Sequence, residues 1–254
     1  MNRRIAWITG ASSGIGYSTA KKLAKQGFDL YLGARRVDRL DSLVKDIKNS
    51  CDVRALSHEL DVTDKDSVQK FGDFGFAKQL QPDVLVNNAG LVKGIDPVVN
   101  GQEQDWDIIL NTNVMGVLRM AKLVLPYMIE KKNGQIVFIG SIAGHQAYAG
   151  GSAYCASKFG VKAITRSLKQ EVLGTNIRVN SIDPGMVETE FSLVRLGSQE
   201  KADNVYKGMT PLTADDVADC VEFVVNRPRH VNIDDIVIMP TDQANAFMVH
   251  RSEP

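Results

Sequence analysis

Seven short apolar runs, separated by longer amphipathic stretches, constrain the fold of this chain more than any other feature of its sequence. Most of the runs are continuously apolar, as is typical of strands that are buried on both faces of a sheet. We expect strands at 4–9, 29–33, 53–57, 83–87, 135–140, 178–182 and 233–239. We expect helices at 14–26, 37–48, 64–79, 101–131, 152–173 and 213–226. Because such alternation produces right-handed βαβ units, it predicts an α/β fold with a Rossmann-type, doubly wound parallel sheet of about seven strands and helices on both faces.

The length and composition favour a single domain over residues 1–254, because no linker, repeat or low-complexity tract divides the chain. Thirty Lys and Arg balance thirty Asp and Glu, so the net charge is zero and gives no electrostatic reason to bind nucleic acid or anionic lipid. The first apolar run is too short for a signal peptide, and no later stretch approaches the roughly 20 apolar residues of a membrane span. We therefore expect a cytoplasmic protein with no nucleic-acid or membrane partner.

Two further features of the composition bear on function. Cys51, Cys155 and Cys220 are scattered and odd in number, so they form neither a CxxC metal site nor a disulfide framework, and we expect no bound metal. The stretch 184–212 is rich in Gly, Ser, Thr and Pro and is expected to be irregular. A long segment of that kind inside a compact domain is usually a lid or binding loop, so we predict a substrate-binding loop there.

A glycine-rich turn follows the first predicted strand. Glycines at 10, 14 and 16 permit a tight turn, a close backbone approach to a pyrophosphate and close packing of the next helix. The start of that helix offers free N–H groups and the positive end of its dipole. An ordinary glycine-rich turn has the same composition, so the strand before and the helix after it carry the prediction. The predicted phosphate-binding residues are Gly10, Ser12, Ser13, Gly14, Ile15 and Gly16.

Two arginines follow the second predicted strand, where dinucleotide-binding folds that use NAD carry an acidic residue. Arg35 and Arg36 suit the 2′-phosphate of NADP(H), and no carboxylate at that point repels it. Asp38 falls beyond the strand, in the first turn of the next helix, where an acid has a structural role. A solvated surface pair of arginines would give the same sequence, but the position favours NADP(H) over NAD.

A tyrosine and a lysine four residues apart lie on one face of a helix, and a nearby ammonium stabilises a phenolate whose free pKa is about 10. The chain contains this spacing three times, at Tyr17/Lys21, Tyr127/Lys131 and Tyr154/Lys158, so the spacing alone is not specific. Only the last pair follows a serine that ends a buried strand, Ser141. Ligands of open α/β folds bind at the carboxyl ends of the strands, so Tyr154, Lys158 and Ser141 are the predicted reacting centre.

Taken together, these motifs resemble the short-chain dehydrogenase/reductase family over the whole chain. They occur in the order expected of that family: 9–16, Asp61-Val62, Asn87-Asn88-Ala89-Gly90, Asn113, Ser141, Tyr154/Lys158 and Pro184-Gly185. Each motif alone has a plain structural explanation, such as a strand-end turn or a surface amide. Their joint occurrence identifies the chain as resembling an NADP-dependent oxidoreductase that acts on CH–OH groups.

The resemblance implies a role for each matching residue. Tyr154 is the general acid or base, Lys158 lowers its pKa and holds the nicotinamide ribose, and Ser141 orients the substrate oxygen. Asn113 kinks its helix to hold a water that links Lys158 to solvent. The remaining cofactor contacts are assigned to Asp61, Val62, Asn87, Asn88, Ala89, Gly90, Pro184, Gly185, Val187 and Thr189.

The substrate is less constrained. Segments 87–94, 148–158, 183–195 and 230–240 resemble the NADP-dependent 3-hydroxy acid dehydrogenases that oxidise serine and allo-threonine. That resemblance implies a short 3-hydroxy acid substrate and a homotetramer, with a homodimer as the smaller possibility. A broad carbonyl reductase or a 3-oxoacyl-carrier reductase would carry the same four catalytic residues, Asn113, Ser141, Tyr154 and Lys158. A non-catalytic NADP-binding sensor would not need to keep it.

Arg195 is the candidate for binding an anionic substrate, because a guanidinium can bind a carboxylate through two hydrogen bonds. A helix-surface arginine is the competing interpretation. His145, in the loop after Ser141, is interpreted as a pocket wall or surface group, since Tyr154 already supplies the proton.

Overall fold

The computed structural model describes residues 3–252 and contains one seven-stranded sheet. Every strand pair is parallel, and the order across the sheet is β3-β2-β1-β4-β5-β6-β7. The strands are β1 (Ile5–Thr9), β2 (Asp29–Ala34), β3 (Ala55–Glu59), β4 (Val84–Asn87), β5 (Gly134–Ile139), β6 (Ile177–Pro184) and β7 (Asp235–Ile238). The order reverses between β1 and β4, which confirms the predicted doubly wound α/β sheet.

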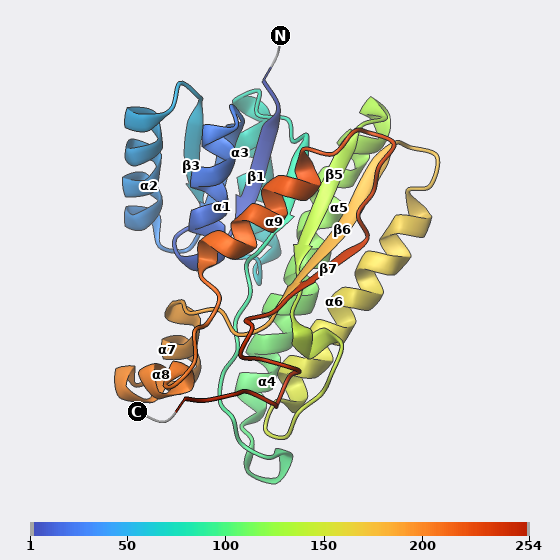
Figure 1. Ribbon diagram of the computed structural model, residues 1–254. Helices are drawn as coiled ribbons and strands as arrows, with labels where there is room; N and C mark the ends of the chain where they lie inside the picture. The colour runs from blue at the N-terminus through green and yellow to red at the C-terminus, as the bar shows by residue number, and fades with distance from the viewer. Residues whose placement is uncertain (1–2, 253–254) are drawn as a thin grey trace.

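Helices cover both faces of the sheet (Figure 1). One face packs against α1 (Gly14–Lys25), α2 (Val37–Ser50) and α9 (Ala214–Val225). The other packs against α3 (Lys65–Ala77), α5 (Gly116–Lys131) and α6 (Ser152–Glu171). Ala6 and Ile8 of β1 belong to the first core, whereas Trp7 between them belongs to the second, because successive side chains of a strand point to opposite faces.

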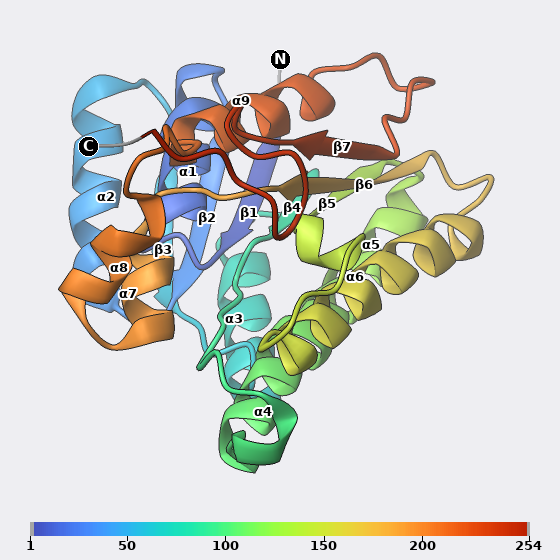
Figure 2. The same ribbon diagram turned by 60° about the horizontal axis from the view of Figure 1, so that its bottom comes forward.

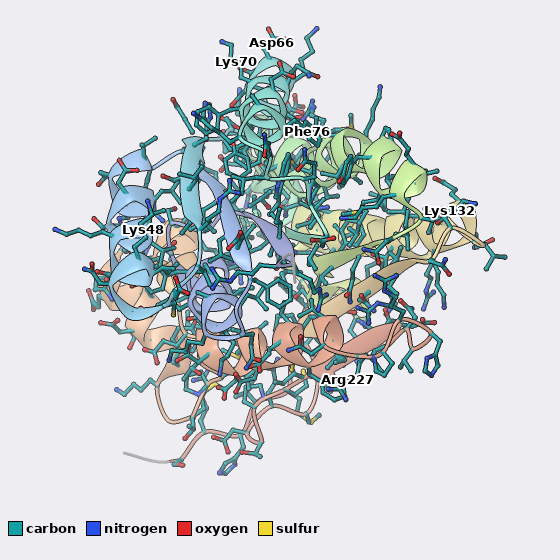
Figure 3. The ribbon with its side chains drawn as sticks, turned by 90° about the horizontal axis from the view of Figure 1, so that it is seen from above. Lys48, Asp66, Lys70, Phe76, Lys132 and Arg227 are labelled. Carbon is teal, nitrogen blue, oxygen red and sulfur yellow. The ribbon has the colours of Figure 1, made fainter. Side chains whose placement is uncertain are left out.

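The aromatic part of the second core explains one of the competing Tyr/Lys pairs. Seen from the amino ends of the strands, Phe76 lies between α3 and α5, while Lys48 and Lys132 lie toward opposite edges of the molecule (Figure 3). The Phe76 ring is 5.3 Å from that of Trp7 and 6.0 Å from that of Tyr127. Tyr127 is therefore part of the hydrophobic packing, far from the carboxyl ends of the strands.

The helix predicted at 101–131 is interrupted. It consists of α4 (Glu103–Leu110), a π-helical turn η2 (Asn111–Met115) and α5. A π-helical turn inserts one extra residue into the hydrogen-bond ladder, and such turns are frequent at functional sites. Its central residue is Asn113, the position at which the family resemblance implies a kink.

The run Glu103–Lys131 is also long and apolar enough, by length and composition alone, to cross a membrane, contrary to our expectation that no stretch approaches that property. Of its most apolar window, 44% is buried inside the protein. Core helices of soluble proteins have the same features, so this observation is weak evidence for a membrane segment. The absence of a membrane partner stays a prediction.

The stretch 184–212 is not irregular as expected. It contains α7 (Glu190–Leu196) and α8 (Gln199–Tyr206), which project together beyond the carboxyl ends of the strands, apart from α4 (Figures 1 and 2). The Thr189 side chain caps α7 by accepting a hydrogen bond from the N–H of Phe191 (3.2 Å), and Gly197 ends it at φ +66°. Three short elements complete the described chain: η1 (Val98–Asn100), η3 (Ile142–Gly144) and the η2 turn.

Candidate active site

A cleft of about 380 Å³ lies at the carboxyl ends of the central strands. It brings together most of the predicted site residues, from segments far apart in the sequence. Those that line it are Gly10, Ser12, Ser13, Gly14, Ile15, Arg35, Arg36, Asp61, Val62, Asn88, Ala89, Gly90, Ser141, Tyr154, Lys158, Pro184, Gly185, Val187 and Thr189. Gly16, Asn87, Asn113 and Arg195 do not line it.

The glycine turn has the backbone that its sequence predicts. Gly10 and Gly14 lie in the left-handed region, at φ +66° and +55°, which disfavours any residue with a side chain. A Cβ at Gly16 would lie 2.6 Å from the Gly10 carbonyl oxygen, so only glycine lets α1 start this close to the turn. The Asn88 amide donates to the carbonyls of Thr9 (2.9 Å) and Gly10 (3.2 Å) and so ties β4 to the turn.

Thr9 supplies a contact that the sequence analysis did not assign. Its hydroxyl accepts the N–H groups of Asn88 (3.0 Å) and Ala89 (2.9 Å), although it is itself buried. Asn87, in contrast, is buried behind the cleft, where its amide donates to the carbonyl of Val117 at 3.4 Å. The end of β4 and the segment after it are thus held by hydrogen bonds to Thr9 of β1 and to Val117 of α5. Asn87 supports the cleft through this segment and does not line it.

The basic edge of the cleft is built from β2, the glycine turn and α7. Arg36 donates to the hydroxyls of Ser13 (2.6 Å) and Ser12 (3.3 Å) and pairs with Glu190 at 2.8 Å. Arg39 pairs with the other carboxylate oxygen of Glu190 at 2.6 Å. The hydrogen bonds from Arg36 and then Arg39 hold the pKa of Glu190 below its usual value. This carboxylate was missed by the sequence analysis, because it joins the edge from a segment 151 residues beyond Arg39.

The donor set at this edge fits a phosphorylated dinucleotide. Two guanidiniums, two hydroxyls and the N-terminus of α1 face the same end of the cleft, which is the chemistry that phosphates need. Asp61 lines the next part of the wall, with its carboxylate held by the N–H (2.9 Å) and hydroxyl (2.7 Å) of Thr63. At Gly10 and Gly14 the glycine turn presents backbone alone to the cleft, beside the Ser12 and Ser13 hydroxyls.

The predicted reacting centre is buried at the other end. Tyr154 and Lys158 lie one turn apart on α6 and are 9% and 8% exposed. The Lys158 ammonium donates to the carbonyl of Ile139 at 2.9 Å, at the end of β5. Ser141 begins the η3 turn, where its hydroxyl accepts the N–H of Ala143 at 3.1 Å. The two other Tyr/Lys pairs have a half-buried tyrosine and an exposed lysine, so burial separates the candidate pair from them.

Burial perturbs both groups of this pair. Loss of hydration raises the pKa of Tyr154 well above its usual value, while the Ser141 hydrogen bond and the charge of Arg195 oppose that change. Loss of hydration lowers the pKa of Lys158 to about 8, opposed by the charge of Asp183. Both groups are therefore biased toward their neutral forms until another charge enters the cleft. Such a pair in a cleft is a candidate for acid–base chemistry.

Asn113 lies one layer behind the cleft, at 1% exposure. Its amide accepts the N–H of Leu91 (2.9 Å) and donates to the carbonyl of the same residue (2.8 Å). It also donates to the Ser157 hydroxyl (3.0 Å), which in turn donates to the carbonyl of Tyr154 (2.7 Å). The π-helical turn is thereby joined to α6 and to the cleft-lining Leu91.

Arg195 lies beside the reacting centre, outside the wall of the main cleft. Its guanidinium carbon is 5.8 Å from the centre of the Tyr148 ring, and its Nε is buried without a hydrogen-bond partner. The Phe191 ring is 5.9 Å from that of Tyr154. Sequence reasoning did not assign Phe191, because its contact with Tyr154 depends on how the chain folds and leaves no local pattern. Across residues 3–252, no group of three or more His, Cys, Asp or Glu side chains is placed to hold a metal ion.

Known proteins resemble this chain in sequence and in fold. An NADP-dependent 3-hydroxy acid dehydrogenase of Schizosaccharomyces pombe is 41% identical over 97% of this chain and 96% of its own length. Sulfoacetaldehyde reductase 2 of Chromohalobacter salexigens is 40% identical, over 97% of this chain and 98% of its own. The closed form of a serine dehydrogenase complexed with NADP+ superposes with a TM-score of 0.91, at 35% identity, covering 98% of this chain and all of that one. Residues 4–196 match the family described as short chain dehydrogenase. This chain therefore belongs to the short-chain dehydrogenase family and is an oxidoreductase.

Proposed function

We propose that the protein transfers hydride between NADP(H) and the 3-hydroxyl or 3-carbonyl carbon of a short 3-hydroxy acid, such as serine, allo-threonine or 3-hydroxypropanoate. One observation carries the proposal: a single cleft joins the basic edge at Arg36 to the buried Tyr154, Lys158 and Ser141. The edge supplies the phosphate contacts, and the buried end supplies the acid–base chemistry. The relatives that are named NADP-dependent or complexed with NADP+ agree with this cofactor.

The nicotinamide of the bound cofactor supplies the chemistry of hydride acceptance and donation. In oxidation, Ser141 donates a hydrogen bond to the substrate oxygen and orients it, while Tyr154 takes the hydroxyl proton. In reduction, Tyr154 returns that proton. The remaining cofactor-lining residues hold the dinucleotide in position beside Tyr154.

The electrostatics of the pair support this assignment. A phenol that is buried and neutral can give a proton, which suits the general acid of reduction. To act as a base, Tyr154 needs nearby positive charge, which the Lys158 ammonium and an oxidised nicotinamide supply in the same direction. Asn113 belongs to the proposal as the residue at the π-helical turn, where the interrupted helix would hold a water that links Lys158 to solvent.

The proposed substrate class rests on Arg195 and on the relatives. The names of the two curated relatives and of the solved serine dehydrogenase describe substrates with an anionic group, a carboxylate or a sulfonate, near the reacting carbon. Arg195 carries a buried and unpartnered Nε close to Tyr154. We assign it to the anionic group of the substrate. A homotetramer in the cytoplasm remains part of the same proposal.

The test is a turnover assay that follows reduced nicotinamide, with NADP+ or NAD+ and a panel of L-serine, L-allo-threonine, 3-hydroxypropanoate, 3-hydroxybutyrate and simple secondary alcohols. We expect turnover of 3-hydroxy acids with NADP+. Turnover of neutral alcohols alone would retain the family and the cofactor but remove the acid specificity. Activity only with carrier-linked acyl chains would establish the alternative, a 3-oxoacyl-carrier reductase.

A further inference from the structure

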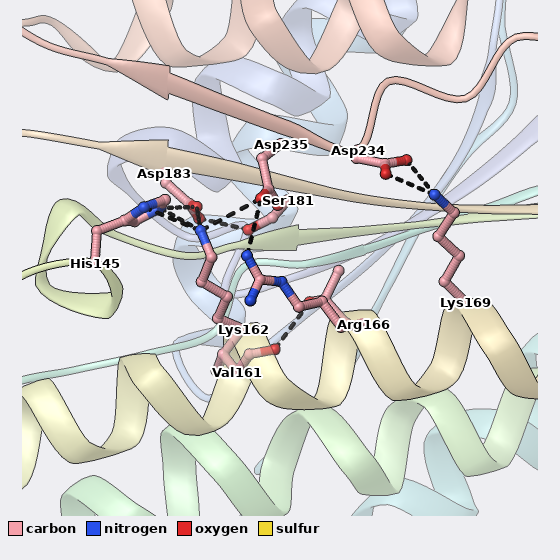
Figure 4. Close-up of polar contacts among 10 residues, drawn as sticks. His145, Val161, Lys162, Arg166, Lys169, Ser181, Asp183, Asp234 and Asp235 are labelled. Atoms are coloured by element: carbon pink, nitrogen blue, oxygen red, sulfur yellow. Dashed lines mark hydrogen bonds and ion pairs between the residues drawn. The ribbon is translucent and has the colours of Figure 1, made fainter.

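A second charged cluster joins β6, β7, α6 and the turn after η3 (Figure 4). Its middle is Asp183 of β6, whose side chain is 3% exposed. One carboxylate oxygen is 2.5 Å from Nε2 of His145 and 3.6 Å from the ammonium of Lys162, and the other accepts the hydroxyl of Ser181. The Lys162 ammonium is also 3.3 Å from Asp235 of β7. His145 is therefore a half-buried member of this network, and its pairing with Asp183 was not predicted from the sequence.

This carboxylate fills the space that a side chain at position 140 would need. A Cβ built on Gly140 would collide with Oδ1 of Asp183 and would lie 2.9 Å from the Ser181 hydroxyl. Gly140 lies between Ile139, whose carbonyl accepts the Lys158 ammonium, and Ser141. Asp183 thus packs against the stretch of backbone that carries Ser141 and accepts the hydrogen bond from Lys158.

The same carboxylate also holds the C-terminal end of segment 140–145, which carries Ser141. His145 directly follows η3, which begins after Ser141, so its bond to Asp183 ties the end of the turn back to β6. The Gly140 N–H donates to the carbonyl of Ile182, one residue before Asp183, at 2.8 Å. The two ends of segment 140–145 are therefore fastened to two adjacent residues of β6, Ile182 and Asp183. The next residue, Pro184, lines the cleft.

Asp183 also acts on Lys158 through charge. The titratable groups that contact Asp183 are His145, after η3, and Lys162 of α6, which also pairs with Asp235 of β7. Tyr154 lies one turn before Lys158 on α6. Of the two carboxylates, Asp183 is the one whose charge opposes the effect of burial on Lys158. Burying a carboxylate is costly unless it is paired, and His145, Lys162 and Ser181 provide that pairing.

We propose that Asp183, held by His145 and Lys162, is a positioning residue that fixes the Ser141 segment and gives the Lys158 ammonium its counter-charge. The inference rests on the proposed function, but its strongest test does not need turnover. The set of residues that act on the reacting centre then includes Asp183, which lies 25 positions beyond Lys158 on β6, the strand next to β5. The expected consequence is that changes in this cluster move proton affinities at the reacting centre, in a direction set by the sign of the charge removed.

The test compares three variants. Asp183→Asn removes the negative charge while keeping the size, and Lys162→Met removes a positive charge from the same cluster. Asp234→Asn is the matched control, because Asp234, just before β7, pairs at 2.6 Å with Lys169 of α6 (Figure 4) but is exposed. The titration of Lys158 is followed by NMR of the protein with ¹³C-methylated lysines, with the signal assigned from Lys158→Arg. Thermal melting checks that each variant folds.

We expect Asp183→Asn to lower the pKa of Lys158 by about one unit, Lys162→Met to raise it, and Asp234→Asn to leave it unchanged. The pH profile of kcat for oxidation should move in the same directions. A purely structural role for Asp183 would reduce kcat equally at all pH values and leave the titration in place, which would overturn the inference. If Asp183→Asn does not fold, the opposite shift in Lys162→Met still decides. If no substrate turns over, the proposed function fails while the NMR titration still tests Asp183.

Discussion

The two ends of the cleft hold their charged groups in different ways. At the reacting centre, Tyr154 and Lys158 are buried, and the lysine is bound to a backbone carbonyl. At the basic edge, Arg36 and Glu190 are more than 40% exposed and bind each other. Loss of hydration determines the protonation of the groups at the reacting centre, whereas solvent and salt screen the charges at the basic edge. Substitutions at the buried end should therefore change the chemical step, and substitutions at the exposed edge should change affinity in a salt-dependent way.

The largest effect is expected for Tyr154→Phe, which keeps the ring and removes the proton donor. We predict a loss of kcat of about 10²- to 10⁴-fold, in the range of general acid–base contributions. Binding of NADPH, measured by its fluorescence, should change little. A variant that keeps most of its turnover would show that another group moves the proton.

The next effect concerns the basic edge. Arg36→Ala should raise the Kd for NADP+ by about tenfold to a hundredfold, because charge-assisted hydrogen bonds contribute about 1.5–3 kcal/mol each. The Kd for NAD+ should change little. Arg39→Ala is the matched control, since Arg39 also pairs with Glu190 but does not line the cleft. Equal losses for both cofactors would contradict a 2′-phosphate contact at Arg36.

Lys158 tests the role of burial directly. Because its folded pKa, about 8, lies below the value of 10.5 for an exposed lysine, the unfolded chain binds more protons between those pH values. Wild-type stability should therefore gain from rising pH in that window, relative to Lys158→Met, by up to about 3 kcal/mol. Denaturant unfolding of both proteins at pH 7 and pH 10.5 measures the difference. If the difference in the free energy of unfolding between the two proteins did not change with pH, folding would not lower the pKa of Lys158.

Arg195→Ala should raise KM for a 3-hydroxy acid about tenfold, through loss of a charge-assisted contact, and leave KM for a neutral carbonyl compound almost unchanged. Arg195→Lys retains the charge but loses the planar pair of donors, so its KM for the 3-hydroxy acid should lie between those of the wild type and Arg195→Ala. Equal effects on acidic and neutral substrates would exclude the carboxylate contact.

The smallest effect is expected for Glu190→Gln. This substitution releases Arg36 and Arg39 from their carboxylate partner, so the affinity for NADP+ should rise about two- to threefold at low salt, as expected for an exposed ion pair. The gain should shrink as salt is added. Weaker binding in the variant would mean instead that Glu190 helps to orient Arg36.

Features that arise from local sequence patterns could be predicted, whereas features that depend on tertiary contacts could not. The sheet followed from its continuously apolar strands, and the family and enzyme class are confirmed. The pattern of apolar side chains could not predict the π-helical turn, because one inserted residue does not change it; only the family resemblance implied a kink at Asn113. Helices α7 and α8 were missed because tertiary contacts support them: the Tyr206 hydroxyl is 2.6 Å from that of Ser192 and donates to the carbonyl of Val187 at 2.7 Å.

The site divides in the same way. The glycine turn, Ser141 and the Tyr154/Lys158 pair are local patterns, so the sequence could nominate them. His145 and Asp183 are 38 residues apart, and only the pairing of β5 with β6 brings them together. Glu190 reaches Arg36 across 154 residues for a similar reason. Pairings that depend on strand order and helix docking leave no local signal in a single sequence.

The central claim is direct hydride transfer from the 3-carbon of the substrate to the cofactor. The most direct measurement is to incubate the protein with NADP+ and 3-hydroxypropanoate that carries deuterium on carbon 3, and to determine the mass of the NADPH formed. The account predicts NADPH with one deuterium on its nicotinamide ring. NADPH without the label, from a labelled substrate that is consumed, would contradict it.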